Sequence, residues 1–87
     1  MKENLLVFIK AISDSNRLKI LNYLKKECCV GDLWDTLKLP QNLVSHHLKV
    51  LKEAKLITAN KQGLKVIYCL NIEIMNKNLE DLNNYLK

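Results

Sequence analysis

A short stretch of the chain carries hydrogen-bonding side chains at helical spacing: Gln41, Asn42, Ser45 and His46. Glutamine and asparagine can each make two hydrogen bonds to adenine, and serine can bond to several bases or to a phosphate. In a helix these four residues turn largely away from the apolar positions Val44, Leu48 and Leu51. The stretch therefore suits a helix that is held by its apolar stripe and reads base edges with its polar face. For any one of these residues, a solvated helix surface is the alternative interpretation.

Lysines surround this polar face and favour a polyanionic partner. Lys49, Lys52 and Lys55 follow along the chain, and Lys61 and Lys65 flank a later polar turn. The chain of 87 residues has a formal charge of +5, from 14 lysines and arginines against 9 acidic residues. Lysine contacts to phosphates position a protein on DNA without specifying sequence. We therefore expect double-stranded DNA as the partner, with Lys49, Lys61 and Lys65 on its backbone.

Hydrophobic spacing predicts the helices that must position this face. The expected helices are Glu3–Ile12, Ser15–Lys26, Asp32–Lys38, Gln41–Ala54 and Ile72–Leu86. Ser13, Asp14 and Ser15 are candidate N-caps of the second helix, and Asp32 can cap the third. A break at Leu39-Pro40 separates the third helix from the fourth, because proline does not continue a helix.

After the fourth helix the pattern changes from helical to strand-like. The runs Leu56–Ala59 and Val66–Leu70 enclose a polar turn at Asn60–Gly63 and predict a β-hairpin. The earlier segment Glu27–Val30 fits either a helix end or a brief strand. Two short helices with a tight break, followed by a hairpin with a basic tip, are the order of a winged helix-turn-helix. We predict a single domain over residues 1–87, mainly α with five helices and a small β-hairpin wing.

The first and last expected helices carry more apolar surface than one small subunit can cover. A domain of this length buries only about 60% of its unfolded surface, so a partner subunit would stabilise it. The apolar positions at issue are Leu5, Phe8, Ile12, Met75, Leu79, Leu82 and Leu86. We expect them to form the two-fold interface of a homodimer.

Three segments of the chain resemble the ArsR/SmtB family of winged-helix repressors. Val44-Ser45-His46-His47-Leu48-Lys49-Val50-Leu51-Lys52-Glu53-Ala54-Lys55-Leu56-Ile57 is similar to the family's recognition helix and first wing strand. Asp14-Ser15-Asn16-Arg17-Leu18-Lys19-Ile20-Leu21 resembles the start of its second helix, and Glu27-Cys28-Cys29-Val30-Gly31-Asp32-Leu33 resembles the segment that opens its third. The resemblance implies a sequence-specific repressor, a homodimer joined by its first and last helices, and an operator of inverted symmetry. It also implies repression relieved by a metal ion or another small inducer.

The inducer positions of the family are only partly kept. Arsenic-type sensors carry Cys-Val-Cys-Asp at the third helix, whereas here Cys29 stands at the first thiol position and Gly31 at the second. Zinc-type sensors place histidines on the last helix, and the only histidines here are His46 and His47. Thiols are therefore the inducer ligands that remain, and a repressor without a small-molecule inducer is the alternative.

Three cysteines are candidates for a thiol site: Cys28, Cys29 and Cys69. If the segment before the third helix pairs with the last strand, Cys69 comes near Cys28 or Cys29. Three thiolates would suit As(III), Cu(I) or Cd(II), and two of them could form a redox disulfide. Burial as small hydrophobic residues is the simplest alternative. An odd number of cysteines argues against a disulfide framework and fits a reducing cytoplasm.

Other function classes find less support in the sequence. No apolar run approaches the ~18 residues of a membrane helix, and the start of the chain lacks the pattern of a signal peptide. No phosphate-binding glycine loop or oriented nucleophile points to an enzyme. A winged-helix protein-interaction module is the remaining rival, but such a surface would show apolar or aromatic anchors.

Overall fold

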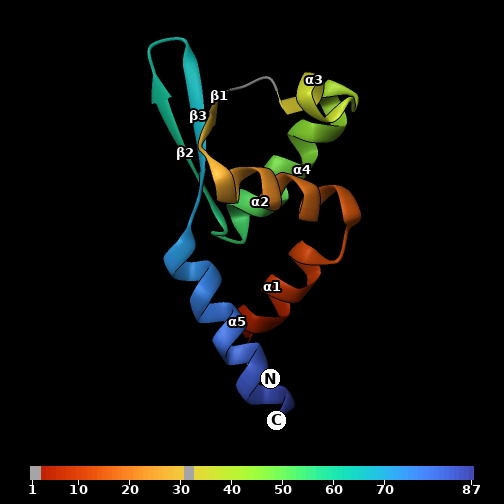
Figure 1. The fold of residues 1–87 in the computed structure, drawn as a ribbon, viewed down its shortest axis with the longest axis vertical. Coiled ribbons are helices and arrows are strands. Elements are labelled where there is room, and N and C mark those ends of the chain that lie inside the picture. Colours follow the sequence, from red (N-terminus) through yellow and green to blue (C-terminus); the bar gives the residue numbers. More distant parts are fainter. Residues whose placement is uncertain (1–2, 31–32) are drawn as a thin grey trace.

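Five helices and one small antiparallel sheet build the computed structural model, which describes residues 3–30 and 33–87. The elements in chain order are α1 (Glu3–Ile12), α2 (Ser15–Lys26), β1 (Cys29–Val30), α3 (Leu33–Leu37), α4 (Gln41–Glu53), β2 (Ile57–Gln62), β3 (Lys65–Leu70) and α5 (Ile72–Leu86). The predicted winged helix-turn-helix order is confirmed (Figure 1).

Local signals fix most of the helix ends. The Asp14 carboxylate caps α2 by accepting hydrogen bonds from the backbone N–H groups of Asn16 and Arg17, as N-caps do. The expected cap of α3, Asp32, lies outside the described residues. Pro40 precedes α4 and provides no side-chain cap; its fixed φ of −56° suits a helix start.

Helices α3 and α4 both end at a lysine in the left-handed conformation. Lys38 has φ 56° and Lys55 has φ 64°. After α4, the N–H of Leu56 donates to the carbonyl of Leu51 at 3.0 Å, and the N–H of Lys55 donates to that of Lys52 at 2.9 Å. This pair of bonds is a Schellman motif, in which glycine usually holds the left-handed position. It turns the chain sharply from α4 into the wing.

The sheet has three strands in the order β1-β3-β2, all antiparallel. The segment that could have been a helix end is thus a short edge strand, with Cys29 opposite Tyr68. The hairpin register pairs Gln62 with Lys65, so its turn is Gly63-Leu64 and lies slightly later than expected. Gly63 has φ +63° at the first central position, where two-residue hairpins of type II′ need glycine.

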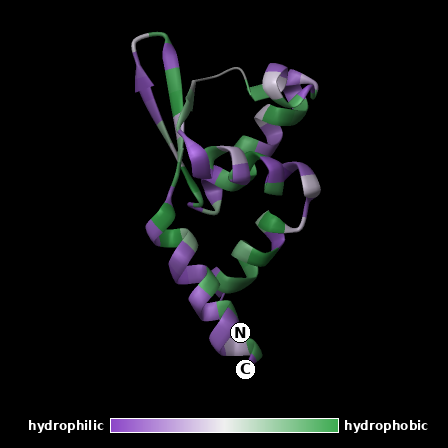
Figure 2. Ribbon diagram, viewed as in Figure 1, coloured by the Kyte–Doolittle hydropathy of each residue, from purple (hydrophilic) through white to green (hydrophobic). Residues whose placement is uncertain are grey.

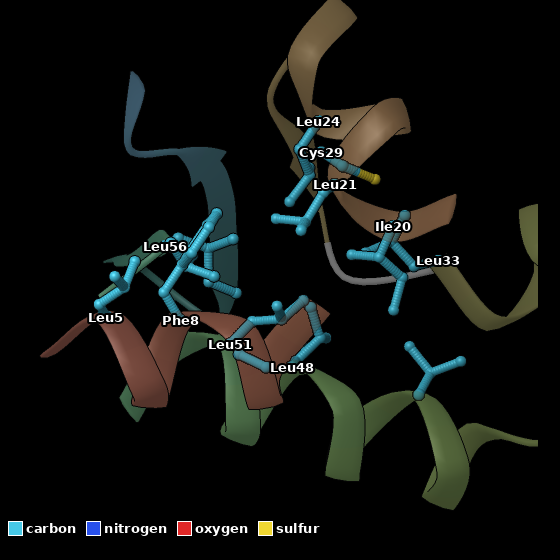
Figure 3. Packing of buried hydrophobic residues seen from close by; sticks show 13 residues of the cluster. Leu5, Phe8, Ile20, Leu21, Leu24, Cys29, Leu33, Leu48, Leu51 and Leu56 are labelled. Atoms are coloured by element: carbon cyan, nitrogen blue, oxygen red, sulfur yellow. The ribbon is translucent and has the colours of Figure 1, made fainter. Parts of the chain in front are cut away.

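The core lies where α1, α2, α4 and the base of the wing meet. Figure 3 shows Phe8 of α1, Leu51 of α4 and Leu56 packed together, with Ile20 of α2 beside Leu33 of α3. All five of these side chains are almost completely buried. The molecule is elongated, 43 × 23 × 21 Å. The wing and α3 lie at one end, and α1 and α5 lie at the other with both termini (Figure 1).

Candidate nucleic-acid interface

Helix α4 presents the polar face that the sequence predicts. Gln41, Asn42, Ser45 and His46 are exposed. On the inner side, Val44, Leu48 and Leu51 are 1%, 8% and 0% exposed. Because the apolar stripe is anchored in the core, the four polar side chains are available to a partner and are held on a fixed element.

A groove of about 300 Å³ separates α4 from the wing. Its α4 wall includes Ser45, Lys49 and Lys52, and its wing wall consists of Ala59, Val66 and Tyr68. Ser45 and Lys49 are thus the predicted residues that the fold brings beside the wing. Gln41, Asn42 and His46 are exposed on α4 but do not line the groove. The groove has cations on one wall and a largely apolar opposite wall.

The wing itself carries exposed lysines at its far end. Lys61 lies on β2 and Lys65 begins β3, and both side chains are exposed. Strand β2 is hydrophilic along most of its length toward the tip (Figure 2). Two separate elements, α4 and the wing, therefore offer positive charge to a partner as long as a DNA duplex.

His47 is a functional candidate that the prediction left out. It lies on α4 next to His46, but its side chain points inward and is only 4% exposed. It contacts Arg17 and Asp14 at the start of α2. Its spacing gives the signal that could have found it, because Val44, His47, Leu48 and Leu51 follow the i, i+3, i+4, i+7 pattern of a buried face.

The pKa values of His47 and Asp14 are both lowered in this cluster, for different reasons. Desolvation lowers the pKa of His47 below its ordinary value of 6.5, although the nearby Asp14 carboxylate opposes the shift. The pKa of Asp14 is lowered below 3.8, mainly by the hydrogen bond from the backbone N–H of Arg17. At neutral pH the structure thus combines a neutral His47 with an ionised Asp14.

The three cysteines divide into a pair and a separate residue. Cys28 and Cys69 form a disulfide, with Cα atoms 4.5 Å apart. Cys29 points into the core and is 7% exposed (Figure 3). Successive residues of a strand face opposite sides of a sheet, so Cys29 does not converge with the other two. A site built from all three thiolates does not fit this arrangement. The expected approach of Cys69 to Cys28 or Cys29 is confirmed for Cys28, and the two form the single disulfide that the sequence left open as an alternative.

The expected dimer residues have unequal exposure within one subunit. Leu5 and Phe8 are 3% and 1% exposed because they belong to the core. Ile12, Met75 and Leu82 are half-buried against that core. Leu79 and Leu86 are 48% and 73% exposed. Leu6 and Val7 of α1, which are not among the expected dimer residues, are also exposed.

Within residues 3–30 and 33–87, no group of three or more histidine, cysteine or acidic side chains is arranged to hold a metal ion. In the same part of the chain, no helix has the length and apolar character that crossing a membrane requires.

Comparison with known proteins agrees with this geometry. The family described as bacterial regulatory protein, arsR family, matches residues 14–59. The arsenical resistance operon repressor of Staphylococcus aureus is 38% identical over 82 residues, which are 93% of this chain and 79% of that protein. The transcriptional repressor SdpR of Bacillus subtilis is 33% identical over 78 residues, 88% of this chain and 87% of that protein.

Solved structures give the same fold. HlyU from Vibrio cholerae superposes with a TM-score of 0.77 at 27% identity and covers 100% of both chains. An ArsR-like transcriptional regulator from Rhodococcus superposes with a TM-score of 0.84 at 24% identity, covering 94% of this chain and 78% of that one. This chain therefore belongs to the arsR family of bacterial regulatory proteins and is a winged helix-turn-helix, DNA-binding transcriptional repressor of that family.

Proposed function

We propose that α4 reads operator DNA in the major groove through Gln41, Asn42, Ser45 and His46. The observation that carries the proposal is the exposure of these side chains on a helix whose other side is fixed in the core. Lys49 on α4, with Lys61 and Lys65 on the wing, would contact the flanking phosphates. The chain would then act by binding, not by catalysis, and in the cytoplasm, where the DNA is.

The type of side chain on α4 also points to a base preference. Guanine is most often contacted by a bidentate arginine or lysine, whereas glutamine and asparagine suit adenine. Lys49 on α4 is assigned above to phosphates. The chain has one arginine, Arg17, and its guanidinium bonds within the protein. We therefore propose that base contacts from α4 favour A·T pairs.

Replacing Ser45 and His46 together by alanine tests the reading face. Each lost base contact should cost about 1–3 kcal/mol of operator affinity, while circular dichroism and thermal unfolding stay those of the wild type. The matched control is Ser15→Ala with Lys19→Ala, an exposed polar pair on α2 that lies outside the proposed reading face. The probe is a duplex that the wild-type protein selects from a random-sequence pool. Unchanged affinity in a folded S45A/H46A variant would refute the assignment.

We further propose that two subunits associate through α1 and α5. Exposed apolar residues lie on both helices: Leu6, Val7, Ile72, Leu79, Tyr85 and Leu86. Apolar segments recur along both helices at the end away from the wing (Figure 2). A two-fold dimer would place two copies of α4 about 34 Å apart, one turn of DNA, which requires an operator of inverted symmetry.

A thiol-based response is a second candidate function, favoured by the Cys28–Cys69 disulfide. Oxidation of the two thiols by hydrogen peroxide would form the S–S bond, break the O–O bond and release two water molecules. The bond ties Cys28, the residue directly before β1, to the central strand β3, and β1 precedes α3 in the chain. Because the disulfide preorganises the helix pair relative to the wing, we expect the oxidised protein to bind its operator more tightly than the reduced protein.

Operator titrations under reducing and oxidising conditions test this candidate, with Cys69→Ser as the variant and Cys29→Ser as the control. Reduction should weaken binding by the wild type and by C29S, and it should leave C69S unchanged. Titrating the reduced protein with As(III) or Cd(II) examines the metalloid alternative. Operator release by these ions, with no effect of peroxide, would replace oxidation by soft-ion binding as the signal.

A further inference from the structure

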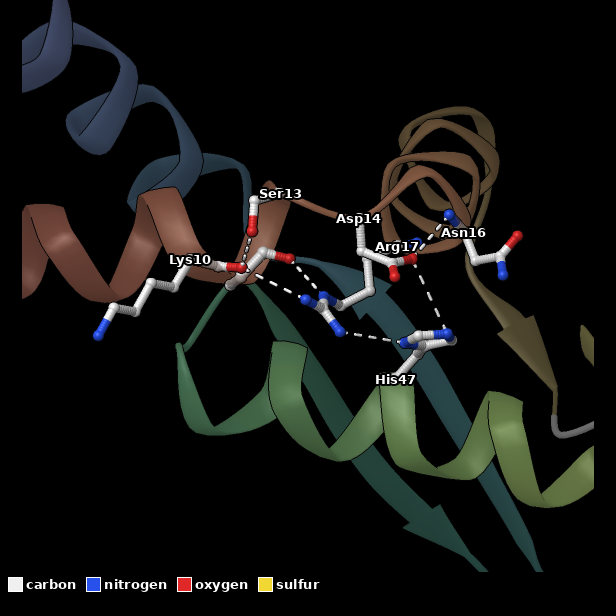
Figure 4. Close-up of polar contacts among 7 residues, drawn as sticks. Lys10, Ser13, Asp14, Asn16, Arg17 and His47 are labelled. Atoms are coloured by element: carbon white, nitrogen blue, oxygen red, sulfur yellow. Dashed lines mark hydrogen bonds and ion pairs between the residues drawn. The ribbon is translucent and has the colours of Figure 1, made fainter.

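Arg17 joins three helices through one guanidinium group. Its Nε donates to the carbonyl of Ala11 at 2.6 Å, and its Nη2 donates to the carbonyl of Lys10 at 3.3 Å. Both carbonyls belong to the last turn of α1, where such groups lack partners within the helix. Its Nη1 lies 3.2 Å from Nδ1 of His47 on α4 (Figure 4). Arg17 itself is in the first turn of α2.

The contact with Arg17 determines which ring nitrogen of His47 carries the proton. An arginine is always a donor, so the Nδ1 atom of His47 must accept and its ring proton must sit on Nε2. Protonation of Nδ1 would place two donors against each other. The histidine is therefore neutral, in agreement with its lowered pKa.

Asp14 faces the other side of the imidazole. Its Oδ1 lies 3.8 Å from Nε2 of His47, too far for a hydrogen bond but near enough for electrostatic attraction. The same oxygen caps α2. The ionisable groups that face His47 are thus Asp14 and Arg17 from α2 and His46 from α4; α1 contributes only the carbonyls that hold Arg17.

Directional bonds of this kind refine a helix orientation that the apolar core sets only coarsely. Burial of Val44, Leu48 and Leu51 turns the polar face of α4 outward, but apolar attraction is non-directional and restricts small rotations about the helix axis less strongly. Groups with defined hydrogen-bond geometry restrict such rotations further. His47 is the buried polar side chain of α4, and it lies directly beside Ser45 and His46 of the proposed reading face.

We propose that Arg17 and His47 are positioning residues that fix the rotation of the reading helix α4 relative to α1. The inference rests on the proposed reading of DNA by α4. Since α1 is also a proposed dimer helix, this contact would set how the two reading faces of a dimer meet successive half-sites. Loss of the Arg17–His47 contact should lower discrimination between operator and random DNA, because discrimination needs correctly placed base contacts. Binding through phosphates should stay largely intact.

The test compares operator affinity with affinity for random duplex DNA, using the operator selected by the wild type. Arg17→Lys keeps the charge but cannot bond three acceptors with one planar fork, and His47→Leu removes the acceptor. Each should lower the operator-to-random ratio by about 5-fold or more, the size of a modest coupling. The matched control is Lys10→Ala, since Lys10 contributes only its carbonyl.

His47→Asn separates positioning from folding. Its amide oxygen can accept from Arg17 near the place of Nδ1, and it does not titrate. We expect this variant to keep the wild-type ratio at pH 7.5. The wild type should lose discrimination as the pH falls through the lowered pKa of His47, which lies below 6.5, and His47→Asn should lack that loss. Both proteins contain His46, so the difference isolates His47.

The outcomes distinguish this proposal from the one on which it rests. Folded R17K and H47L proteins with a wild-type ratio would overturn the positioning role, as would an H47N protein that keeps the wild-type pH profile. If S45A/H46A also binds the operator normally, the reading face itself is wrong. If only S45A/H46A is impaired, the reading face stands and the positioning role fails.

Discussion

The salt dependence of DNA binding gives a quantitative test of the lysine contacts. Lys49, Lys61 and Lys65 are exposed on two elements that flank the groove between α4 and the wing. Each phosphate contact contributes about 0.9 to the slope of log affinity against log salt. In a dimer every lysine occurs twice, so one Lys→Ala substitution should reduce the slope by about 1.8. When the salt concentration rises fourfold, the variant should therefore lose about 12-fold less operator affinity than the wild type loses.

Fluorescence anisotropy with the selected operator and with a random duplex, at several salt concentrations, measures these slopes. K61A and K65A should weaken binding to both duplexes by the same factor, because phosphates carry no sequence information. Lys19→Ala on α2 is the matched control, since Lys19 is exposed and lies outside α4, the wing and the helices of the proposed dimer end. An unchanged slope for K61A and K65A, or a loss confined to the operator, would refute the phosphate assignment.

Three further predictions concern assembly and stability. Leu79→Glu should shift the protein from dimer to monomer in sedimentation velocity, with wild-type helix content, because Leu79 is 48% exposed within one subunit; a dimer of unchanged affinity would contradict the α1–α5 interface. Lys38→Gly should raise the free energy of unfolding by roughly 0.5–1 kcal/mol, because it removes a side chain from a left-handed position, whereas Lys25→Gly within α2 should lower it by about 1 kcal/mol. Chemical denaturation at several pH values should show that the free energy of unfolding falls as the pH drops below 6.5, because the pKa of His47 is lowered on folding and the unfolded chain binds the proton first. H47N should lack this fall. Both proteins should lose stability as the pH drops below 3.8, because the pKa of Asp14 is also lowered on folding and its carboxylate is protonated first in the unfolded chain.

Periodicity predicts the helices of this chain well because their apolar stripes are regular. The bounds of α1, α2 and α5 agree with the expectation, and α4 ends one residue early at Glu53. The difference at α4 comes from the left-handed Lys55, which no residue type signals, since glycine is the usual marker. Strand β1 was ambiguous because two residues are too short to show alternation, and only pairing with β3 defines it.

The sequence predicts the solvent-exposed side of α4 better than its buried side. Polar residues such as Ser45 are exposed as expected because they lie off the apolar stripe of α4, and their contact with DNA stays a prediction. His47 lies on that stripe, but its role depends on Arg17, which is distant in sequence and reaches it only in the folded chain. The Cys28–Cys69 bond likewise depends on the register of β1 against β3, which residue spacing alone does not fix.

Helix α1 has apolar residues on a buried face and on an exposed face, and the exposed face is the clearest indication of a partner subunit. Leu5, Phe8 and Ala11 face the core and are 3%, 1% and 2% exposed, whereas Leu6 and Val7 on the other side are 42% and 43% exposed. A helix that is apolar on opposite faces is normally buried on both, and one subunit covers only the first face. The same helix ends at the carbonyls that hold Arg17. If the proposed interface and the proposed positioning role both hold, dimer formation and orientation of the reading helix depend on opposite sides and ends of α1. A change at the subunit interface would then have a short physical route to the DNA-reading face.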